Sequence, residues 1–492
     1  MYTLIHNRYR AALVLLMLVF MVIFSAYGIH RLYTFNSNYF DLGIMDQVVH
    51  NTAHGRFLEM TNQDLHRNTS RLAIHFDPIL ALFAPLYSIY QGPEVLIVGQ
   101  VVVVGMGALA VFLLARKMLK SDMAGLLFAA SYLLFYPIQR AVLFDFHSVV
   151  LATSFILFLI YFIESKRYVF ASICLILALL TKENVGLVTF MLGAYYVFVR
   201  KERRFSPYMM AASVIAFVAT VFMIIPYFRQ NSHFALKYYG EFGDSPGRII
   251  LGIFEQPLLT AQKVLTVEAL MYLGSLLLSH GLFIVFAPIE FLISLSDLLI
   301  NLLSANQNMR GIYFHYNALI VPFIFLSAIV GYGRIRTKFG PASVKYVVAL
   351  MVLAHAVSIY QYNPVPLSWV KEPAYRDTID YSKLATVKEW SQKLGYEVKV
   401  SSTPRLAPFF TGRHYYYDFL FDSAFYGLGM SEDDIIRSVG NYEQADYVVI
   451  AKSELNHENK VLQTFFDHLR TNKKYQEVEN KGDIQVFKRI SN

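Results

Sequence analysis

Cysteine and charged residues are both scarce in this chain. It has one cysteine, Cys174, among 492 residues, and charged residues make up only 16% of them. A single cysteine excludes a disulfide within the chain and a cluster of thiolate metal ligands. Hydrophobic residues make up 56% and the mean hydropathy is +0.43. This composition excludes a soluble protein of this length and predicts a membrane protein.

Long apolar runs indicate a polytopic α-helical membrane protein. A membrane helix needs ~20 apolar residues, because every backbone polar group must be satisfied inside the bilayer. The first run follows a short basic stretch, but no A-x-A-like cleavage site follows it, which favours a retained span over a signal peptide. We expect about eleven transmembrane helices, near residues 11–27, 94–115, 122–137, 148–164, 168–181, 185–200, 207–228, 264–279, 281–303, 315–333 and 344–361.

Basic residues gather in alternate loops. The positive-inside rule places these loops in the cytoplasm, together with the N-terminus, and it accounts for the formal charge of +8 without nucleic-acid binding. The cytoplasmic set is Arg8/Arg10, Arg116/Lys117/Lys120, Lys166/Arg167, Arg200/Lys201/Arg203/Arg204 and Arg334/Arg336/Lys338. The remaining loops then face outward, and they carry all the clusters of reactive side chains.

The composition divides the chain into a transmembrane domain over 1–362 and a soluble extracytoplasmic α/β domain over 363–492. Within the first domain, a large outer loop over 31–92 includes an apolar segment, 79–90, that is too short to span and predicts an interfacial helix. The second domain has no G-x-G-x-x-G motif, which argues against a dinucleotide site. Its expected helices are 379–394, 431–438 and 458–470, and its expected strands are 397–402, 414–419, 446–452 and 484–489.

The outer loop begins with two aspartates, Asp41 and Asp46, and ends in the sequence from His75 to Pro78. A carboxylate at the bilayer surface can serve as a general base, although Asp is also a common helix N-cap. Asp41, Asp46, His75 and Asp77 are of the right types to hold a divalent cation. Alternatively, His75 binds a phosphate or sugar and Asp77 caps the interfacial helix.

Two shorter outward loops carry further candidates. Asp145 and His147 lie at the end of a predicted span, where ionisable groups are functional candidates unless they snorkel to water. Lys182 and Glu183 interrupt a nearly continuous apolar run. Lys182 suits a phosphate, and Glu183 suits the orientation of a catalytic group; the alternative is a simple turn that solvates both charges.

A third outward loop runs from Arg310 to Tyr316 and includes His315. Arginine and histidine beside tyrosines suit a phosphorylated, partly apolar ligand. The alternative is an aromatic belt at the membrane interface with a snorkelling arginine.

Five short motifs in order resemble the prokaryotic membrane proteins grouped as domain of unknown function 2079. They are F-D-x-G-x-x-D-Q (40–47), H-F-D-P before A-P-L-Y (75–87), D-F-H (145–147), K-E-N (182–184) and an H-Y before a late span. That family looks like a branch of the type C (GT-C-like) glycosyltransferases. The resemblance implies a multi-span enzyme of the prokaryotic plasma (inner) membrane that transfers a hexosyl or pentosyl group from a polyprenyl-phosphate donor on the outer face.

By position in the resemblance, Asp41 matches the catalytic acidic residue, and Asp46 and Glu183 would position it. The resemblance implies no cofactor with certainty, because the Asp-Glu pair and the D-x-D motif of some relatives are both missing, and a divalent cation stays open. A transporter or lipid-carrier flippase, or a non-catalytic scaffold, is the alternative function. The candidate residues for binding substrate and phosphate are His75, Asp77, Asp145, His147, Lys182, Arg310, His315 and Tyr316.

Overall fold

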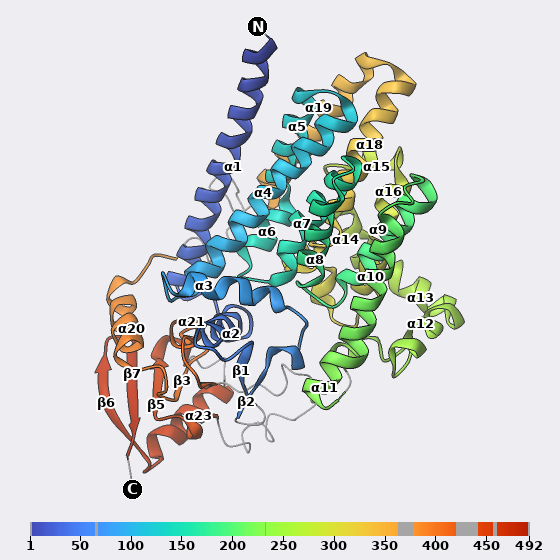
Figure 1. Ribbon diagram of the computed structural model, residues 1–492. Helices are drawn as coiled ribbons and strands as arrows, with labels where there is room; N and C mark the ends of the chain where they lie inside the picture. Colours follow the sequence, from blue (N-terminus) through green and yellow to red (C-terminus); the bar gives the residue numbers. More distant parts are fainter. Residues whose placement is uncertain are drawn as a thin grey trace. The chain divides into compact units, whose positions relative to one another are not determined.

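The computed structural model describes residues 2–63, 67–231, 233–362, 377–419, 441–455 and 460–490, and these residues are mostly helical (Figure 1). They form two compact units. The helical unit consists of Met1–Ala26, Leu72–Ile79 and Val98–Glu372. The mixed unit consists of Tyr27–Arg71, Leu80–Ile97 and Pro373–Asn492.

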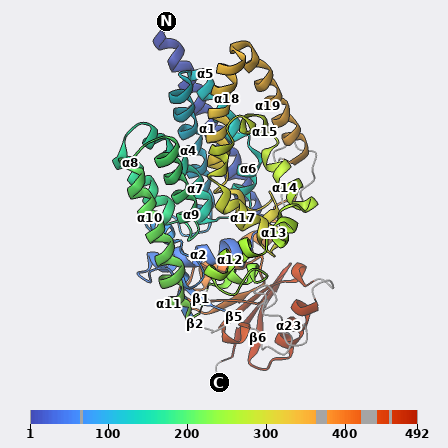
Figure 2. The ribbon, with the colours of Figure 1, turned by 90° about the vertical axis from the view of Figure 1, so that its right-hand side faces the viewer.

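The helical unit is built from apolar helices that satisfy their own backbone hydrogen bonds. Helices that follow each other closely pack together, as α7 does with α8, α9 with α10, and α18 with α19 (Figures 1 and 2). Its main helices are α4 (Glu94–Leu119), α5 (Asp122–Leu133), α6 (Tyr136–Leu143), α7 (Ser148–Glu164), α8 (Tyr168–Leu179), α9 (Val185–Ala194), α10 (Ser206–Ala219), α11 (Ile225–Arg229), α12 (Pro246–Glu255), α13 (Pro257–Val264), α14 (Val267–Leu277), α15 (Gly281–Val285), α16 (Pro288–Leu292), α17 (Leu295–Leu303), α18 (Val321–Phe339) and α19 (Pro341–Tyr362).

Shorter turns complete the helical unit, and several elements contain residues of both units. The long helix α1 (Tyr2–Tyr33) and helix α4 are divided between the units, as is the turn η3 (Pro78–Phe83). The turns within the helical unit are η2 (Arg71–Ala73, which begins at the unit boundary), η4 (Tyr195–Val199), η5 (Thr220–Ile224), η6 (Phe234–Tyr239), η7 (Gln307–Arg310) and η8 (His315–Asn317).

Candidate spans are fewer in the structure than the expected eleven. Within the described residues, four helices are long and apolar enough to cross a membrane, at 8–33, 94–119, 206–229 and 341–360. Helices α5 and α6 make a fifth if the pair, bent by 46°, is one broken span. Several other expected spans are apolar helices of 10–17 residues. The polytopic helical class is therefore supported, whereas the count is not reproduced.

Proline explains the two clearest differences from the expected spans. The run 281–303 was expected as one helix, and this prediction is wrong: it is divided into α15, α16 and α17. Pro288 begins α16 and has no N–H to continue the ladder of α15. The span expected at 315–333 begins instead at Val321, with Pro322 in the first turn of α18.

The mixed unit contains a five-stranded sheet in the order β4-β3-β5-β7-β6. Strands β3, β4 and β5 are parallel, and β7 pairs antiparallel with both β5 and β6. The strands are β3 (Val400–Ser402), β4 (Tyr416–Asp418), β5 (Tyr447–Ala451), β6 (Tyr475–Lys481) and β7 (Ile484–Arg489), and the helices are α20 (Tyr381–Lys393), α21 (Ala407–Phe410) and α23 (Lys460–Thr471), with turns η10 (Asn441–Gln444) and η11 (Lys452–Glu454).

The four expected strands and two of the expected helices of this sheet are present. Strand β6 was not predicted, because its residues are mostly exposed and polar. The helix expected at 431–438 and the prolines at 364, 366 and 373 lie outside the described residues. A small α/β domain with a partly parallel sheet therefore agrees with the sequence.

The first loop joins the C-terminal sheet in the mixed unit, whereas the composition predicts that the whole of 31–92 belongs to the transmembrane domain. Gln63 Nε2 donates to the carbonyl of Tyr416 at 3.0 Å, and the Tyr416 N–H donates to Thr61 Oγ1 at 3.1 Å. The loop forms a π-helical turn, η1 (Tyr39–Gly43), then α2 (Ile44–Ala53), the hairpin β1 (Glu59–Asn62) and β2 (Arg67–Ser70), and finally η3 and α3 (Ala84–Tyr87). The apolar segment expected at 79–90 is thus helical from Pro78 to Tyr87.

Candidate functional site

Glu183 is the centre of a buried hydrogen-bond network in the helical unit. It lies in the turn between α8 and α9 and is 9% exposed. Its Oε1 lies 2.9 Å from His75 Nδ1 and 3.1 Å from His233 Nε2, and its Oε2 accepts from the Phe76 N–H at 3.1 Å. Burial favours the neutral acid, but positive charge at His75 and the bonds from both histidines hold the pKa of Glu183 well below its ordinary value.

The same three side chains are the group most suited to a metal ion among the described residues. Ligand atoms of His75, Glu183 and His233 all lie within 4.8 Å of one another. However, His233 Nδ1 accepts the Ala235 N–H at 3.0 Å, so the proton of the neutral ring is on Nε2. A metal at Nε2 would need the other tautomer, so the arrangement fits a hydrogen-bond network better than it fits a resident metal.

A second pair of histidines lies in the helical unit. His147 immediately precedes α7, and His315 begins η8. Their rings stack with centroids 3.7 Å apart, and both side chains are buried. Tyr316 lies against His315, with ring centroids 4.4 Å apart. Two loops far apart in sequence therefore present adjacent imidazoles.

Gln100, in the interior of α4, fixes the turn that carries His147. Its Nε2 donates to the carbonyl of Asp145 at 2.8 Å, and its Oε1 accepts the His147 N–H at 2.8 Å. Asp145 has a φ of 67°, which is uncommon for a residue other than glycine. A fully buried glutamine thus holds this turn in a strained conformation.

The basic candidates of three other loops lie close enough to His315 for their charges to act on it. Burial, and then the nearby positive charges of His147, Lys182 and His75, hold the pKa of His315 well below its ordinary value. Lys182 in turn acts on the buried carboxylate of Asp297, which accepts a 2.8 Å bond from Asn184. We name His75, His147, Lys182 and His315 the basic cluster. Its members come from four separate loops and are the type of group that binds an oxyanion.

Three further candidates of the helical unit, Arg310, Asp77 and Asp145, are not members of the basic cluster. Arg310 is in η7 and lines a pocket of about 340 Å³ together with Tyr272 and Tyr313, and this pocket is lined by no member of the basic cluster. Asp77 and Asp145 are buried, at 3% and 5% exposed.

The two aspartates of the first loop belong to the mixed unit and differ from each other. Asp41 is partly exposed in η1, and the residues at the N-caps of η1 and α2 are Asn38 and Gly43, so the alternative that Asp41 is a helix N-cap does not hold for these two helices. Asp46 is 1% exposed, and its two oxygens accept from Tyr87 Oη at 2.8 Å and from Thr411 Oγ1 at 2.9 Å. Burial raises the pKa of Asp46 to about 7, against the effect of these two bonds.

Of the four metal ligands suggested by the sequence, Asp41 and Asp46 are in the mixed unit, and His75 and Asp77 are in the helical unit. Only His75 belongs to the group of three ligands described above.

A family model described as "Predicted membrane protein (DUF2079)" matches residues 31–486. The chain belongs to this family. Among solved structures, ArnT from Cupriavidus metallidurans bound to undecaprenyl phosphate aligns with a TM-score of 0.53 at 12% identity, covering 96% of this chain and 98% of that one. The apo oligosaccharyltransferase of Archaeoglobus fulgidus gives a TM-score of 0.43 at 12% identity, covering 94% and 73%. No curated protein sequence matches the chain.

The match to the DUF2079 model extends over both units, from before Asp41 to the last strand of the sheet. The similarity to ArnT shows a shared fold. In this DUF2079 protein, sequence reasoning missed His233, Asp297 and Gln100. Asp297 and Gln100 are in apolar helices, where an isolated polar residue would have been the only signal.

Proposed function

We propose that this protein is a membrane glycosyltransferase that uses a sugar carried on a polyprenyl phosphate, with the basic cluster receiving the phosphate. The observation that supports this most is the convergence of His75, His147, Lys182 and His315 in the helical unit. The shared fold adds support, because ArnT was solved with undecaprenyl phosphate bound.

The cluster is suited to a leaving phosphate because Lys182 supplies a positive charge and the imidazoles supply ring N–H donors in a partly buried site. The Lys182 side chain is partly buried, whereas His147 and His315 are 7% and 8% exposed. Charge stabilisation is stronger in such surroundings than in water, and preorganised donors need little rearrangement as charge develops. Glu183 would position His75 by accepting its Nδ1 proton, which leaves Nε2 for the ligand.

The catalytic base in this proposal is Asp41. Its carboxylate takes the proton of an acceptor hydroxyl while the hydroxyl oxygen bonds to the anomeric carbon of the sugar. The bond between that carbon and the phosphate oxygen breaks, and the electron pair leaves with the polyprenyl phosphate. Asp46 has both oxygens engaged in hydrogen bonds, which suits support of α2 better than proton transfer.

The basic cluster is tested with the full chain reconstituted in vesicles that contain a synthetic polyprenyl-phosphate hexose and an envelope fraction as acceptor. The product, free polyprenyl phosphate, is measured by mass spectrometry. Lys182→Gln and His315→Ala should each lower product formation at limiting donor by about tenfold or more, since each removes a charge-assisted contact worth about 1.5–3 kcal/mol. Unchanged rates in both variants would refute the phosphate assignment.

Asp41→Asn tests the base in the same assay. It should abolish most of the turnover while donor binding persists, because the amide cannot accept the proton. Asp467→Asn, at an exposed position on α23, is the matched control and should leave turnover unchanged. Turnover in Asp41→Asn at the wild-type rate would refute the role of Asp41.

A further inference from the structure

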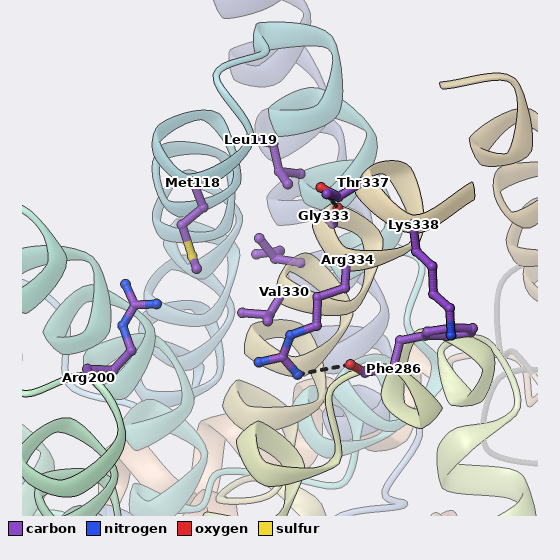
Figure 3. Close-up of a pocket in the computed structure, with 10 residues that line it drawn as sticks. Met118, Leu119, Arg200, Phe286, Val330, Gly333, Arg334, Thr337 and Lys338 are labelled. Carbon is purple, nitrogen blue, oxygen red and sulfur yellow. Dashed lines mark hydrogen bonds between the residues drawn. The ribbon is translucent and has the colours of Figure 1, made fainter. Parts of the chain in front are cut away.

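A second pocket lies at the ends of several helices of the helical unit. Its volume is about 540 Å³. It has apolar walls and basic side chains at its margin, and Figure 3 shows Arg200 on one side of it and Arg334 and Lys338, from α18, on the other. The lining residues are Met118, Leu119, Phe286, Ile329, Val330, Gly333 and Thr337, together with Arg200, Arg334 and Lys338.

Two helices, α4 and α18, connect this pocket to the region of the basic cluster, and each carries the two sites near opposite ends. In α4, Gln100 accepts the His147 N–H, and Met118 lines the pocket. The two residues are 18 positions apart, which is about 27 Å along a helix at 1.5 Å per residue. In α18 the helix begins just after η8, and Arg334 lies in its last two turns. The separation of about 27 Å matches the ~30 Å thickness of a hydrocarbon core.

The charge of the pocket is not fully balanced. Arg334 pairs with Glu290 at 2.9 Å, and Arg200 pairs with Glu164 at 2.9 Å. The two arginines remain 46% and 39% exposed, and a guanidinium has five N–H groups, so each keeps donors for another ligand. Lys338 has no ion pair among the described residues, which leaves three cations against two carboxylates.

The apolar wall decides what kind of anion fits. Met118, Phe286 and Val330 form a surface that a free inorganic anion would leave unused. A glycerophospholipid with a negative headgroup satisfies both parts, because its phosphate meets the basic side chains while an acyl chain covers the apolar ones. Basic pockets between membrane helices recognise anionic headgroups in this way.

We propose that this pocket binds the headgroup phosphate of an anionic glycerophospholipid, at the end of the bundle opposite the basic cluster. The site shares no residue with the basic cluster, and it does not depend on the proposed glycosyl transfer. It places a lipid contact at the ends of α4 and α18, where the sequence has its basic loops.

The test uses the purified full-length protein in detergent and native mass spectrometry. Phosphatidylglycerol is titrated against the wild type, and phosphatidylethanolamine and inorganic phosphate are titrated in parallel. Phosphatidylglycerol should be retained at least about tenfold better than phosphatidylethanolamine, and inorganic phosphate should not displace it.

Two variants and one control locate the binding. Lys338→Glu reverses the charge at the pocket, and Thr337→Trp fills it from an exposed position. Each should weaken retention of phosphatidylglycerol by about tenfold. Arg336→Glu makes a similar charge change on an exposed turn of α18 outside the pocket and should change retention less than twofold.

Three results would overturn the proposal. Equal retention in Lys338→Glu and Thr337→Trp would show that the lipid binds elsewhere. Equal retention of the two lipids would show an apolar groove without headgroup recognition. Displacement by inorganic phosphate would show an anion site that needs no lipid. Protection of the buried Cys174 from a maleimide verifies that each variant is folded.

Discussion

Replacement of Asp46 by alanine should strongly destabilise the mixed unit. The carboxylate is the acceptor for Tyr87 Oη and Thr411 Oγ1, and it joins α2 to α3 and to α21. Asp46→Ala leaves two hydroxyls without this acceptor in a buried site. Each buried unsatisfied group costs about 1–3 kcal/mol, so the free energy of unfolding should fall by about 2–6 kcal/mol.

Asp46→Asn tests the effect of the charge alone, because asparagine keeps nearly the shape of aspartate and does not ionise. The pKa of Asp46 is about 7 in the folded chain, and near 4 when unfolded. Between these values the folded state binds more protons, so wild-type stability should fall as pH rises from 4 to 7, by at most about 4 kcal/mol. The amide does not titrate. The stability of Asp46→Asn relative to wild type should therefore increase over that interval and then stay constant.

Urea unfolding in detergent, followed by tryptophan emission, measures both effects. Trp390 is buried in the mixed unit, and Trp369, which lies outside the described residues, is replaced by Phe in all variants. Asp467→Asn is the exposed control and should keep the wild-type midpoint. If Asp46→Ala unfolds at the wild-type urea concentration, or if the difference between wild type and Asp46→Asn does not depend on pH, the reasoning is refuted.

Three further predictions concern the stability of the helical unit. The measured quantity is the midpoint temperature at which the buried Cys174 becomes reactive to a maleimide dye. Glu183→Ala removes a buried acceptor of three hydrogen bonds and should lower the midpoint clearly, and a midpoint equal to that of wild type would contradict the network. Gly331→Ala places a Cβ 2.1 Å from the Phe283 carbonyl oxygen and should destabilise, whereas Gly274→Ala, with open space around it, should not. Chelation should leave the midpoint unchanged, and a shift caused by Zn²⁺ that disappears when His233 is replaced by Ala would show a metal site.

The basic cluster was predictable from the sequence because its members share one pattern. His75, His147, Lys182 and His315 all follow or precede apolar runs, in loops that lack the basic residues of the cytoplasmic side. A topology assigned by charge gathers such loops at one face. It does not say which of them touch, and Arg310, in an equivalent loop, lines a different pocket.

The network around Glu183 was beyond sequence reasoning. His233 lies in a long segment that gave no periodic signal, and its role depends on a bond formed across 50 residues. Gln100 lies in an apolar run, where its two bonds to the 145–147 turn leave no trace in the pattern. Tertiary hydrogen bonds of single polar residues are specified by packing, which local periodicity does not encode.

The grouping of the first loop with the C-terminal sheet was hidden for a similar reason. Gln47, Thr61 and Gln63 read as residues of a solvated loop, and the structure buries them against the backbone of residues 413–418. Each amide or hydroxyl satisfies an edge group of the sheet that would otherwise be buried without a partner. A boundary drawn from composition alone cannot detect such a pairing across 350 residues.

Two independent observations assign the same orientation across the membrane to the helical unit. The basic loops were assigned to one side from the sequence alone, and Arg200, Arg334 and Lys338 then line one pocket at the corresponding helix ends. The histidines and Lys182 lie near the other ends of the same helices. One end is basic with carboxylate partners and an apolar wall, which suits a structural lipid. The other combines stacked imidazoles with a buried glutamate, which suits a ligand whose charge changes during a reaction.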